Sequence, residues 1–389
     1  MRAHIKRHGH APRVDLYDAL GLAGGATAAC SGLLHPLAPS GAPLWNGEAG
    51  CRAAEALVRI ASAGNDGVAR RTGALRVAKH EEQAAQFAAL WGPDGRCVPD
   101  GIRGPWTPRL LSRNEARQVL PLIDMPTNAA LFVPGARVIN ASAYVARLVE
   151  TAHRLATSSG GGEVRVVRER VDSATSLGRE YDGVVIAAGA AVGSLTDVSA
   201  MTYDAWKQGG DDNASVVSVP LQLCHGEAVH LSTSPESSLN GLASLLGTHY
   251  VAMPVSARHG AAVGATRRQL DGIASIAPSA LRPVPDQEAA SYMLDAAAAR
   301  WPPLRDESAS TRTLVAGVRA SSPRTQHGCV PLVGRAKRNL TGCAPVWLCV
   351  AMGARGLVYH ALVGFQLANA LVNGQDDDVL DREFTRHIR

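Results

Sequence analysis

Hydrophobic residues gather along the chain in short runs of apolar and β-branched side chains, which is the pattern of buried β-strands. Three further segments repeat apolar residues at the spacing of an amphipathic helix, and Asn140 or Ser142 can cap the first of them. The predicted strands are residues 13–18, 163–171, 181–189, 250–255, 313–320 and 346–353, and the predicted helices are 140–156, 286–301 and 362–374. Strands mixed with helices in this way indicate an α/β or mixed α+β architecture.

Polar stretches rich in glycine and serine separate these elements. Residues 158–163, 207–215 and 232–241 have this composition and are predicted to be surface loops. The longest apolar tract, residues 344–372, is interrupted by Arg355 and His360. Charged side chains at that depth are costly in a bilayer, so the tract is not expected to span a membrane.

Composition narrows the class of protein. The chain has 389 residues, of which 46% are hydrophobic, so it can bury a large core in two domains or one large α/β unit. A net charge of +5 requires no nucleic-acid or membrane partner, although it does not exclude an RNA substrate. The 7 cysteines form no C-x-x-C pair, which argues against a disulfide framework and a zinc site. We expect a soluble protein that is cytoplasmic or organellar rather than secreted.

The stretch RVDLYDALGLAGGATAACSGLLHP, residues 13–36, begins like a phosphate-binding turn. A dinucleotide fingerprint needs G-x-G-x-x-G, but Gly21 is followed by Ala23 and Ala26, so the pattern fails. Asp18 ends this strand, where the ribose-binding carboxylate of a Rossmann unit belongs. The strand is therefore interpreted as the second of the unit, with MRAHIKRHGH as the end of the preceding helix. An ordinary strand and a glycine-rich surface turn remain the alternative.

Four motifs in order resemble the FAD-dependent oxidoreductases of the D-amino acid oxidase and glycine oxidase type. They are LYDALGLAGGATAACSGLLHP, YDGVVIAAGA, TLVAGVRASSPRTQHGCVPLVG and VWLCVAMGARGLVYHALVGFQLANALVNG. Among subfamilies, GARGL at 353–357 looks most like the oxidoreductase half of the bifunctional tRNA 5-methylaminomethyl-2-thiouridine biosynthesis protein. The resemblance implies the fold, the cofactor FAD and a redox activity.

The implied fold is a discontinuous Rossmann-like FAD-binding domain with an inserted mixed-sheet substrate domain. Residues 1–60, 140–204 and 311–389 would form the first, and 61–139 and 205–310 the second. Relative to the family the chain is expected to be truncated at its N-terminus, lacking the first strand and the G-x-G-x-x-G loop. Losing two or three charge-assisted hydrogen bonds of about 1.5–3 kcal/mol each would leave FAD held poorly or not at all.

The resemblance also implies which residues contact FAD. Gly353 and Gly356 flank the start of a long apolar helix, whose free amide groups favour an electron-rich flavin edge. A turn without a ligand is the alternative, and His35 either faces the flavin or is an ordinary core or surface histidine. The implied FAD contacts are Asp18, Thr27, Ala28, Ser31, Gly32, Leu33, Val171, Ala188, Gly189, Gly353, Gly356 and Leu357.

Two arginines are the candidate catalytic residues. Arg319 lies in a strand of small and apolar residues, where an unpaired cation is costly, so it needs an anionic partner. The resemblance implies a substrate carboxylate, and a structural salt bridge is the alternative. Arg355 can neutralise charge on the reduced flavin, hold a substrate acid, or be a solvated turn residue. His225 and His230 have no nearby third ligand, so no metal site is expected.

The implied reaction is hydride transfer from the carbon beside a substrate amine to the flavin, giving an imine that hydrolyses. The substrate would be a small amine or amino acid. One alternative is an oxidoreductase that matures the wobble uridine of tRNA. Another is a cofactor-free, non-catalytic relative or an incomplete gene product.

Overall fold

The fold was analysed in a computed structural model. It describes residues 2–97, 104–201, 204, 207, 217–233, 237–256, 259–270, 284–307, 312–336, 344–373 and 380–386.

Two small sheets contain the parallel strands predicted for the cofactor domain. Helix α1 (Arg2–His8) precedes β1 (Arg13–Tyr17), which pairs in parallel with β8 (Glu163–Val167). The second sheet has the order β18-β19-β9, and β19 pairs in parallel with β9. Its strands are β9 (Val184–Ile186), β18 (Leu332–Arg335) and β19 (Val346–Val350). Within the described residues, β1 and β9 are each paired along one edge only.

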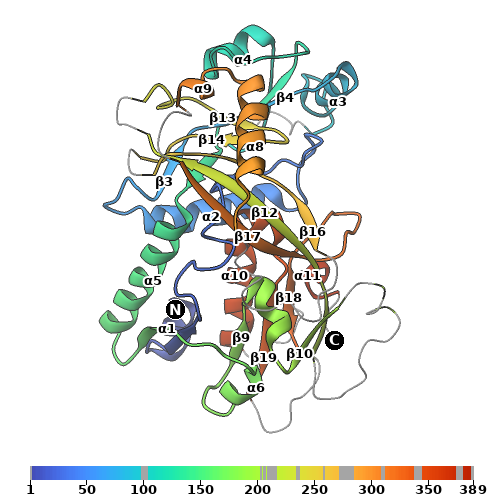
Figure 1. The fold of residues 1–389 in the computed structure, drawn as a ribbon. Helices are drawn as coiled ribbons and strands as arrows, with labels where there is room; N and C mark the ends of the chain where they lie inside the picture. The colour runs from blue at the N-terminus through green and yellow to red at the C-terminus, as the bar shows by residue number, and fades with distance from the viewer. Residues whose placement is uncertain are drawn as a thin grey trace.

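A nine-stranded sheet forms the upper half of the molecule in Figure 1. Its strand order is β16-β12-β15-β14-β13-β4-β6-β5, and β17 (Arg312–Ser321) pairs with β12 along all ten of its residues. The remaining strands are β4 (Ala74–Val77), β5 (Arg109–Leu111), β6 (Ala130–Val133), β12 (Gln222–Leu231), β13 (Ser244–Leu246), β14 (Tyr250–Ala252), β15 (Ala261–Gly264) and β16 (Arg268–Leu270). The segment expected to begin the last part of the cofactor domain, residues 311–389, thus starts with a strand of this large sheet. The domain boundaries themselves stay a prediction.

The other elements connect and cover these sheets. Two smaller sheets have the orders β2-β7-β3 and β10-β11. They comprise β2 (Leu33–Leu34), β3 (Ala69–Arg71), β7 (Arg137–Ile139), β10 (Val198–Met201) and β11 (Val217–Pro220). The helices are α2 (Gly47–Ala61), α3 (Glu81–Trp91), α4 (Arg113–Val119), α5 (Ala141–Ser158), α6 (Ala174–Leu177), α8 (Gln287–Arg300), α9 (Leu304–Glu307), α10 (Gly356–Asn373) and α11 (Arg382–Thr385), with 3-10 helices η1 (Gly189–Ser194) and η3 (Gly353–Arg355).

Helices pack on opposite faces of the large sheet. Alternate strand residues such as Leu75 and Val251 join the core beneath α8, while Ala74 and Leu246 join the core that includes α2 and α10. The contact between α2 and α10 is close, because a Cβ atom on Gly50 would lie 2.3 Å from the carbonyl oxygen of Val358. In Figure 1, α8 lies over the large sheet and α10 lies beneath it. The face with Ala74 and Leu246 is therefore the one that packs against α2 and α10.

Most of the predicted elements are present, with shifted ends. Five of the six predicted strands are shorter than expected, among them 181–189, which forms a strand only over β9, and the sixth, 313–320, is slightly longer. The helix predicted at 140–156 is α5, and the basic N-terminal segment forms α1, as expected. Apart from Lys207, the predicted loop 207–215 lies outside the described residues. Within the described part of the chain, no helix is long and apolar enough to cross a bilayer.

Candidate active site

One face of the large sheet carries Arg319. In the β12–β17 pair, Arg319 is opposite Cys224 and Gly317 is opposite Gly226, so these four positions share a face. The guanidinium of Arg319 lies over Gly226, where an added Cβ atom would be 2.7 Å from its Nη2. Glycine at 226 therefore gives the arginine room to lie along the sheet. The nearest polar contact of Arg319 is the Cys224 Sγ, 3.9 Å away.

A tyrosine that the sequence reasoning missed lies on the same face. We call this face, with Arg319, Gly226 and Tyr250, the Arg319 wall. The Tyr250 side chain lies close to Ser31, and its pKa is raised, chiefly by burial. Arg319 is close enough for its charge to act on the same hydroxyl. A Cβ atom on Gly264 would lie 2.5 Å from the Tyr250 Oη, so this hydroxyl also lies over a glycine. The structure thus brings the predicted residues Arg319 and Ser31 together around Tyr250.

The loop after β1 packs against this wall by close backbone contact. A Cβ atom on Gly317 would lie 3.1 Å from the Cα of Ala26. At the end of the loop, Gly32 has a φ of +73°, and a Cβ atom there would meet the Ile139 carbonyl oxygen at 1.9 Å. Only glycine fits at 32, since both the conformation and the space exclude a side chain. Thr27 and Ala28, two predicted FAD contacts in this loop, are exposed.

The start of α10 lies against β17. Gly353 has a φ of +54°, and a Cβ atom on it would be 2.6 Å from the Ser321 Oγ. A β-bridge between Ser321 and Met352 holds the same junction. Since Ser321 is two residues beyond Arg319 on β17, the predicted residues Gly353 and Arg319 lie on neighbouring parts of one wall. Gly356 and Leu357 form the first turn of α10.

Three basic side chains gather beside this junction. Arg76, on β4, is only 9% exposed, and its single hydrogen bond is from Nη1 to the Pro39 carbonyl oxygen at 3.3 Å. The Arg76 Nε is buried without a partner. Burial and the nearby charge of Arg355 lower the pKa of Arg76 to about 10. Within the described residues, no hydrogen bond or ion pair of the Arg355 guanidinium is found.

His35 is the third member of this group. It is 6% exposed, and its Nδ1 accepts a hydrogen bond from the Leu37 amide at 3.2 Å. Burial lowers the pKa of His35 well below its usual value, and the charges of Arg355 and Arg76 lower it further. The imidazole is therefore neutral, with a proton on Nε2. His35 is thus a buried histidine beside Arg76 and Arg355, and its contact with the flavin stays a prediction.

The remaining predicted FAD contacts follow the ends of parallel strands, where open α/β sheets bind ligands. Asp18 follows β1, Val171 comes after β8, and Ala188 and Gly189 follow β9. The Asp18 Oδ1 accepts a hydrogen bond from the Leu20 amide at 2.8 Å. Ala188 and Gly189 are exposed, and Leu33 lies in β2.

A second acidic residue of β1 has a different role from Asp18. The Asp15 side chain is fully buried and accepts hydrogen bonds from Arg165 Nε and Nη2, both at 2.7 Å. Arg13 at 3.0 Å and the Tyr181 hydroxyl at 2.5 Å complete its contacts. These donors hold the pKa of Asp15 far below its usual value. Because Tyr181 precedes β9, Asp15 links the two small sheets.

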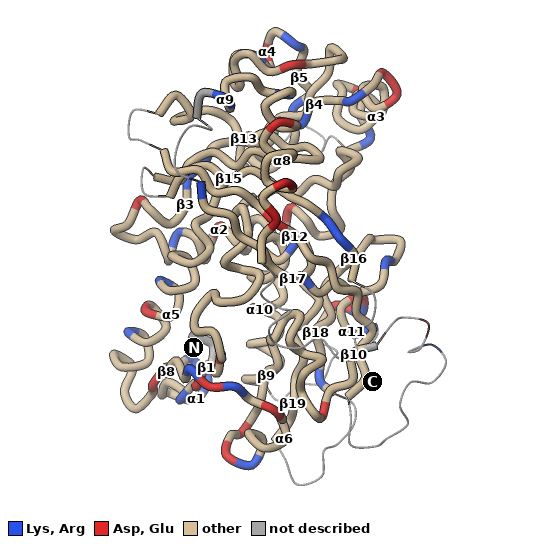
Figure 2. The backbone as a smooth tube through the Cα atoms, viewed as in Figure 1, with Lys and Arg blue, Asp and Glu red and all other residues tan. Residues whose placement is uncertain are grey.

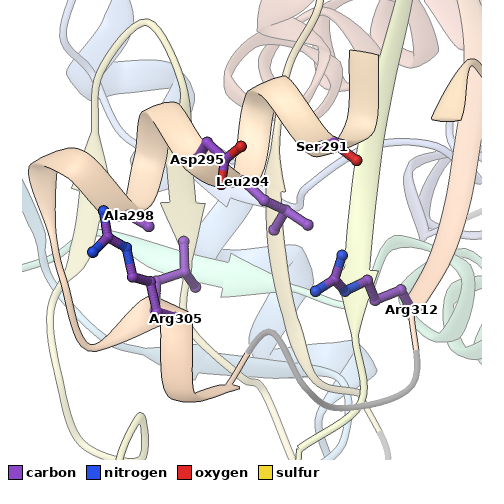
Figure 3. Close-up of a pocket in the computed structure, with 7 residues that line it drawn as sticks. Ser291, Leu294, Asp295, Ala298, Arg305 and Arg312 are labelled. Atoms are coloured by element: carbon purple, nitrogen blue, oxygen red, sulfur yellow. The ribbon is translucent and has the colours of Figure 1, made fainter. Parts of the chain in front are cut away.

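The predicted pair His225 and His230 is five residues apart on β12, so the two side chains project from opposite faces, and His230 is the one on the Arg319 face. The described residues hold no metal-binding group of three. A small hollow of about 180 Å³ lies between α8, α9 and the start of β17, with Asp295, Arg305 and Arg312 on its lining (Figure 3). Arg312 and Arg319 are an odd number of residues apart, so the sheet separates the hollow from the Arg319 wall.

The FAD dependent oxidoreductase (DAO) family matches residues 3–370 of the sequence. The chain belongs to this FAD-dependent oxidoreductase family. A search of curated proteins finds no match.

Solved structures of similar fold agree with this family. Iminodiacetate oxidase (IdaA) from Chelativorans sp. BNC1 has a TM-score of 0.67 at 19% identity, covering 98% of this chain and 94% of that chain. Glycine oxidase from Geobacillus kaustophilus has the same TM-score and identity, covering 100% of this chain and 94% of that one. L-amino acid deaminase from Proteus vulgaris has a TM-score of 0.66 at 15% identity, covering 98% and 93%.

Residues in the loop after β1 and at the start of α10 fit the flavin end of FAD. Gly32 and Gly317 permit close backbone approach, the start of α10 is the positive end of a helix dipole, and the half-buried cation Arg355 beside it suits an electron-rich group. Ser31, Gly353 and Gly356 are among the residues that would hold this end. The described residues contain no G-x-G-x-x-G turn, so no residue is assigned to the pyrophosphate.

Proposed function

We propose that this chain oxidises a C–N bond of a small amine or amino acid, with FAD as the hydride acceptor. The observation that carries the proposal is that Arg319 and the Tyr250 hydroxyl lie over glycines on one face of the large sheet, the face that meets the loop after β1. A guanidinium beside a protonated phenol is a strong donor set for a carboxylate. Glycine oxidase and L-amino acid deaminase, by name, act on substrates with such a group.

Each residue contributes binding or orientation rather than covalent chemistry. Arg319 would bind the substrate carboxylate through two parallel hydrogen bonds, and the Tyr250 hydroxyl would donate a third. Because burial raises the pKa of Tyr250, the phenol stays protonated at neutral pH and remains a donor. When bound, FAD supplies the two-electron acceptor, so no nucleophilic side chain is required. Fixing one end of the substrate in this way would orient the carbon beside the amine.

Anaerobic reduction of the flavin tests this proposal without assuming an electron acceptor. The chain is loaded with FAD and mixed with glycine, N-methylglycine and a panel of D- and L-amino acids, and absorbance near 450 nm is followed. At least one amine should bleach the flavin, and Arg319→Met should slow that bleaching at least 100-fold, which is about 2.7 kcal/mol.

Arg117→Met is the matched control. Arg117 is exposed on α4, and α4 packs on the face of the large sheet opposite Arg319. It should reduce the flavin at the unaltered rate. Failure of every amine to bleach a fully loaded flavin would contradict the proposal, and failure of the chain to take up FAD would favour the cofactor-free, non-catalytic alternative. Equal rates for Arg319→Met and Arg117→Met would remove the role assigned to Arg319.

Oxidation of a tRNA wobble uridine stays a prediction. Basic and acidic segments are interspersed along the described chain (Figure 2). A tRNA partner would show itself by binding that weakens steeply as salt is raised, because phosphate contacts release counterions.

A further inference from the structure

The strand register of the large sheet places a second arginine on the same wall as Arg319 and Tyr250. Arg76 on β4 is beside Leu246 on β13, and Leu246 follows the β13–β14 register directly opposite Tyr250. Residues aligned across neighbouring strands share a face of the sheet. Two strand spacings separate the backbones of Arg76 and Tyr250, which is about 10 Å.

The cluster of Arg76, Arg355 and His35 comes from three separate segments that converge. Arg76 lies on the substrate-side sheet, His35 directly follows β2, and Arg355 ends η3 before α10. Arg76 and Arg355 are close enough that each bears on the charge of His35. Bringing two guanidiniums together at a largely buried position is unfavourable unless a negative group offsets the repulsion.

No acidic side chain of the described chain fills that role. Ten ion pairs are found among the described residues, and none of them includes Arg76 or Arg355. The Pro39 carbonyl is the single hydrogen-bond acceptor of Arg76, and it is neutral. The Nε2–H of His35 adds a third donor without adding charge. The site is thus rich in donors and short of acceptors.

We propose that Arg76, with Arg355 and His35, forms a second anion-binding subsite, and that the substrate is an amino acid or amine carrying two acidic groups. One acidic group is bound by Arg319 and Tyr250, and the other by Arg76. This inference rests on the proposed function, which identifies the substrate site. It adds that the part of the substrate farthest from Arg319 carries a second acidic group. Arg76 is then a specificity-determining residue.

A substrate acid suits this subsite better than the cofactor does. Arg76 belongs to the same sheet as Tyr250 and Arg319, so it is fixed relative to the carboxylate-binding residues. The flavin contacts are placed on the loop after β1 and on α10; His35 and Arg355 adjoin these segments, whereas Arg76 does not. A backbone separation of about 10 Å, shortened by two long side chains, matches acidic groups held several bonds apart on one small molecule.

Equilibrium binding of acids that cannot be oxidised separates the two subsites. Glutarate has two carboxylates, and butyrate is a similar chain with one. Both are titrated into the FAD-loaded protein, and binding is followed by calorimetry and by the flavin spectrum. The unaltered protein should bind glutarate at least tenfold more tightly than butyrate, because the second carboxylate gains charge-assisted hydrogen bonds.

Variants assign that preference to residues. Arg76→Met should bind glutarate and butyrate equally, Arg76→Lys should keep part of the preference, and Arg319→Met should weaken both acids. Arg117→Met serves again as the surface control and should bind like the unaltered protein. Thermal unfolding of each variant without ligand shows that the fold is retained.

Three results would overturn the inference. Equal binding of the two acids by the unaltered protein is one, and a preference that survives in Arg76→Met is another. The third is an Arg76→Met protein that loses FAD while its glutarate preference persists, which would assign Arg76 to the cofactor. Binding is measured without turnover. A protein that oxidises no amine but still shows the Arg76-dependent preference for glutarate would therefore contradict only the proposed function.

Discussion

The Asp15 cluster and the Arg76–Arg355 cluster each contain a charged side chain that is buried, Asp15 in one and Arg76 in the other, yet they differ in how that charge is paired. Asp15 receives donors from Arg13, Arg165 and Tyr181, all from its own chain. The arginine cluster has no acidic partner among the described residues. The comparison indicates that a charge satisfied internally is structural, whereas a buried charge left unsatisfied is reserved for a ligand.

The largest expected effect is a loss of activity on replacing Arg319. In the comparison, Arg319 belongs with the cations that bind a ligand. Arg319→Met should lower kcat/KM by two to three orders of magnitude, about 3–4 kcal/mol, because the substrate loses a bidentate charged partner. Its unfolding midpoint should be almost unchanged, since Arg319 forms no ion pair among the described residues. Steady-state kinetics together with thermal unfolding check this. A large loss of stability would make Arg319 structural instead.

Asp15→Asn should behave in the opposite way. Replacing the carboxylate leaves Arg165 and Arg13 without their charged acceptor, and we expect the free energy of unfolding to fall by about 1–3 kcal/mol. Substrate binding should change little, because Asp15 contacts no residue of the Arg319 wall in the described structure. Urea unfolding and a glutarate titration on the same sample measure both quantities. The interpretation fails if Asp15→Asn alters binding and leaves stability intact.

The same aspartate should make stability depend on acid. Its pKa is lowered in the folded protein, so its contribution is fully present above the unfolded value of about 3.9. That contribution is lost as the pH falls further and the folded carboxyl takes up a proton. Between pH 5 and pH 3 the unaltered protein should therefore lose more stability than Asp15→Asn does. Parallel slopes for the two proteins would show that other carboxyls dominate.

The smallest expected effect concerns His35. An ordinary histidine would gain charge below about pH 6.5 and strengthen anion binding. Burial, Arg355 and Arg76 lower the pKa of His35, so it stays neutral across this range. Glutarate affinity should change less than about twofold between pH 8 and pH 6. A rise of several-fold on acidification, absent in His35→Gln, would show that His35 does take up a proton there.

Much of the fold could be predicted from the sequence, because strands such as β1, β17 and β19 are apolar runs with clear ends. Helix α2 was not predicted, although it is amphipathic, because its buried positions include Gly50, Cys51 and Ala54, which are small rather than strongly apolar. Small residues are what its close contact with α10 requires, so the feature that permits packing also makes the helix easy to overlook.

The site was predictable in part for a related reason. Arg319 stood out as a cation inside an apolar strand, and Arg76 in ALRVA has the same local pattern. It was missed because a strand of four residues is too short to interpret from the sequence. Tyr250 begins a strand and gives no sign of its role. Only the strand register, which pairs residues far apart in the sequence, brings Arg76 and Tyr250 onto one wall.

The edges of β1 and β9 that have no partner strand among the described residues have a practical consequence for work with this protein. An unpaired strand edge presents backbone donors and acceptors that can pair with another chain. Val185 on β9 and Val166 on β8 are each 41% exposed nearby. Concentrated samples should therefore be prone to edge-to-edge association between molecules, and low protein concentration is the condition in which binding constants should be measured.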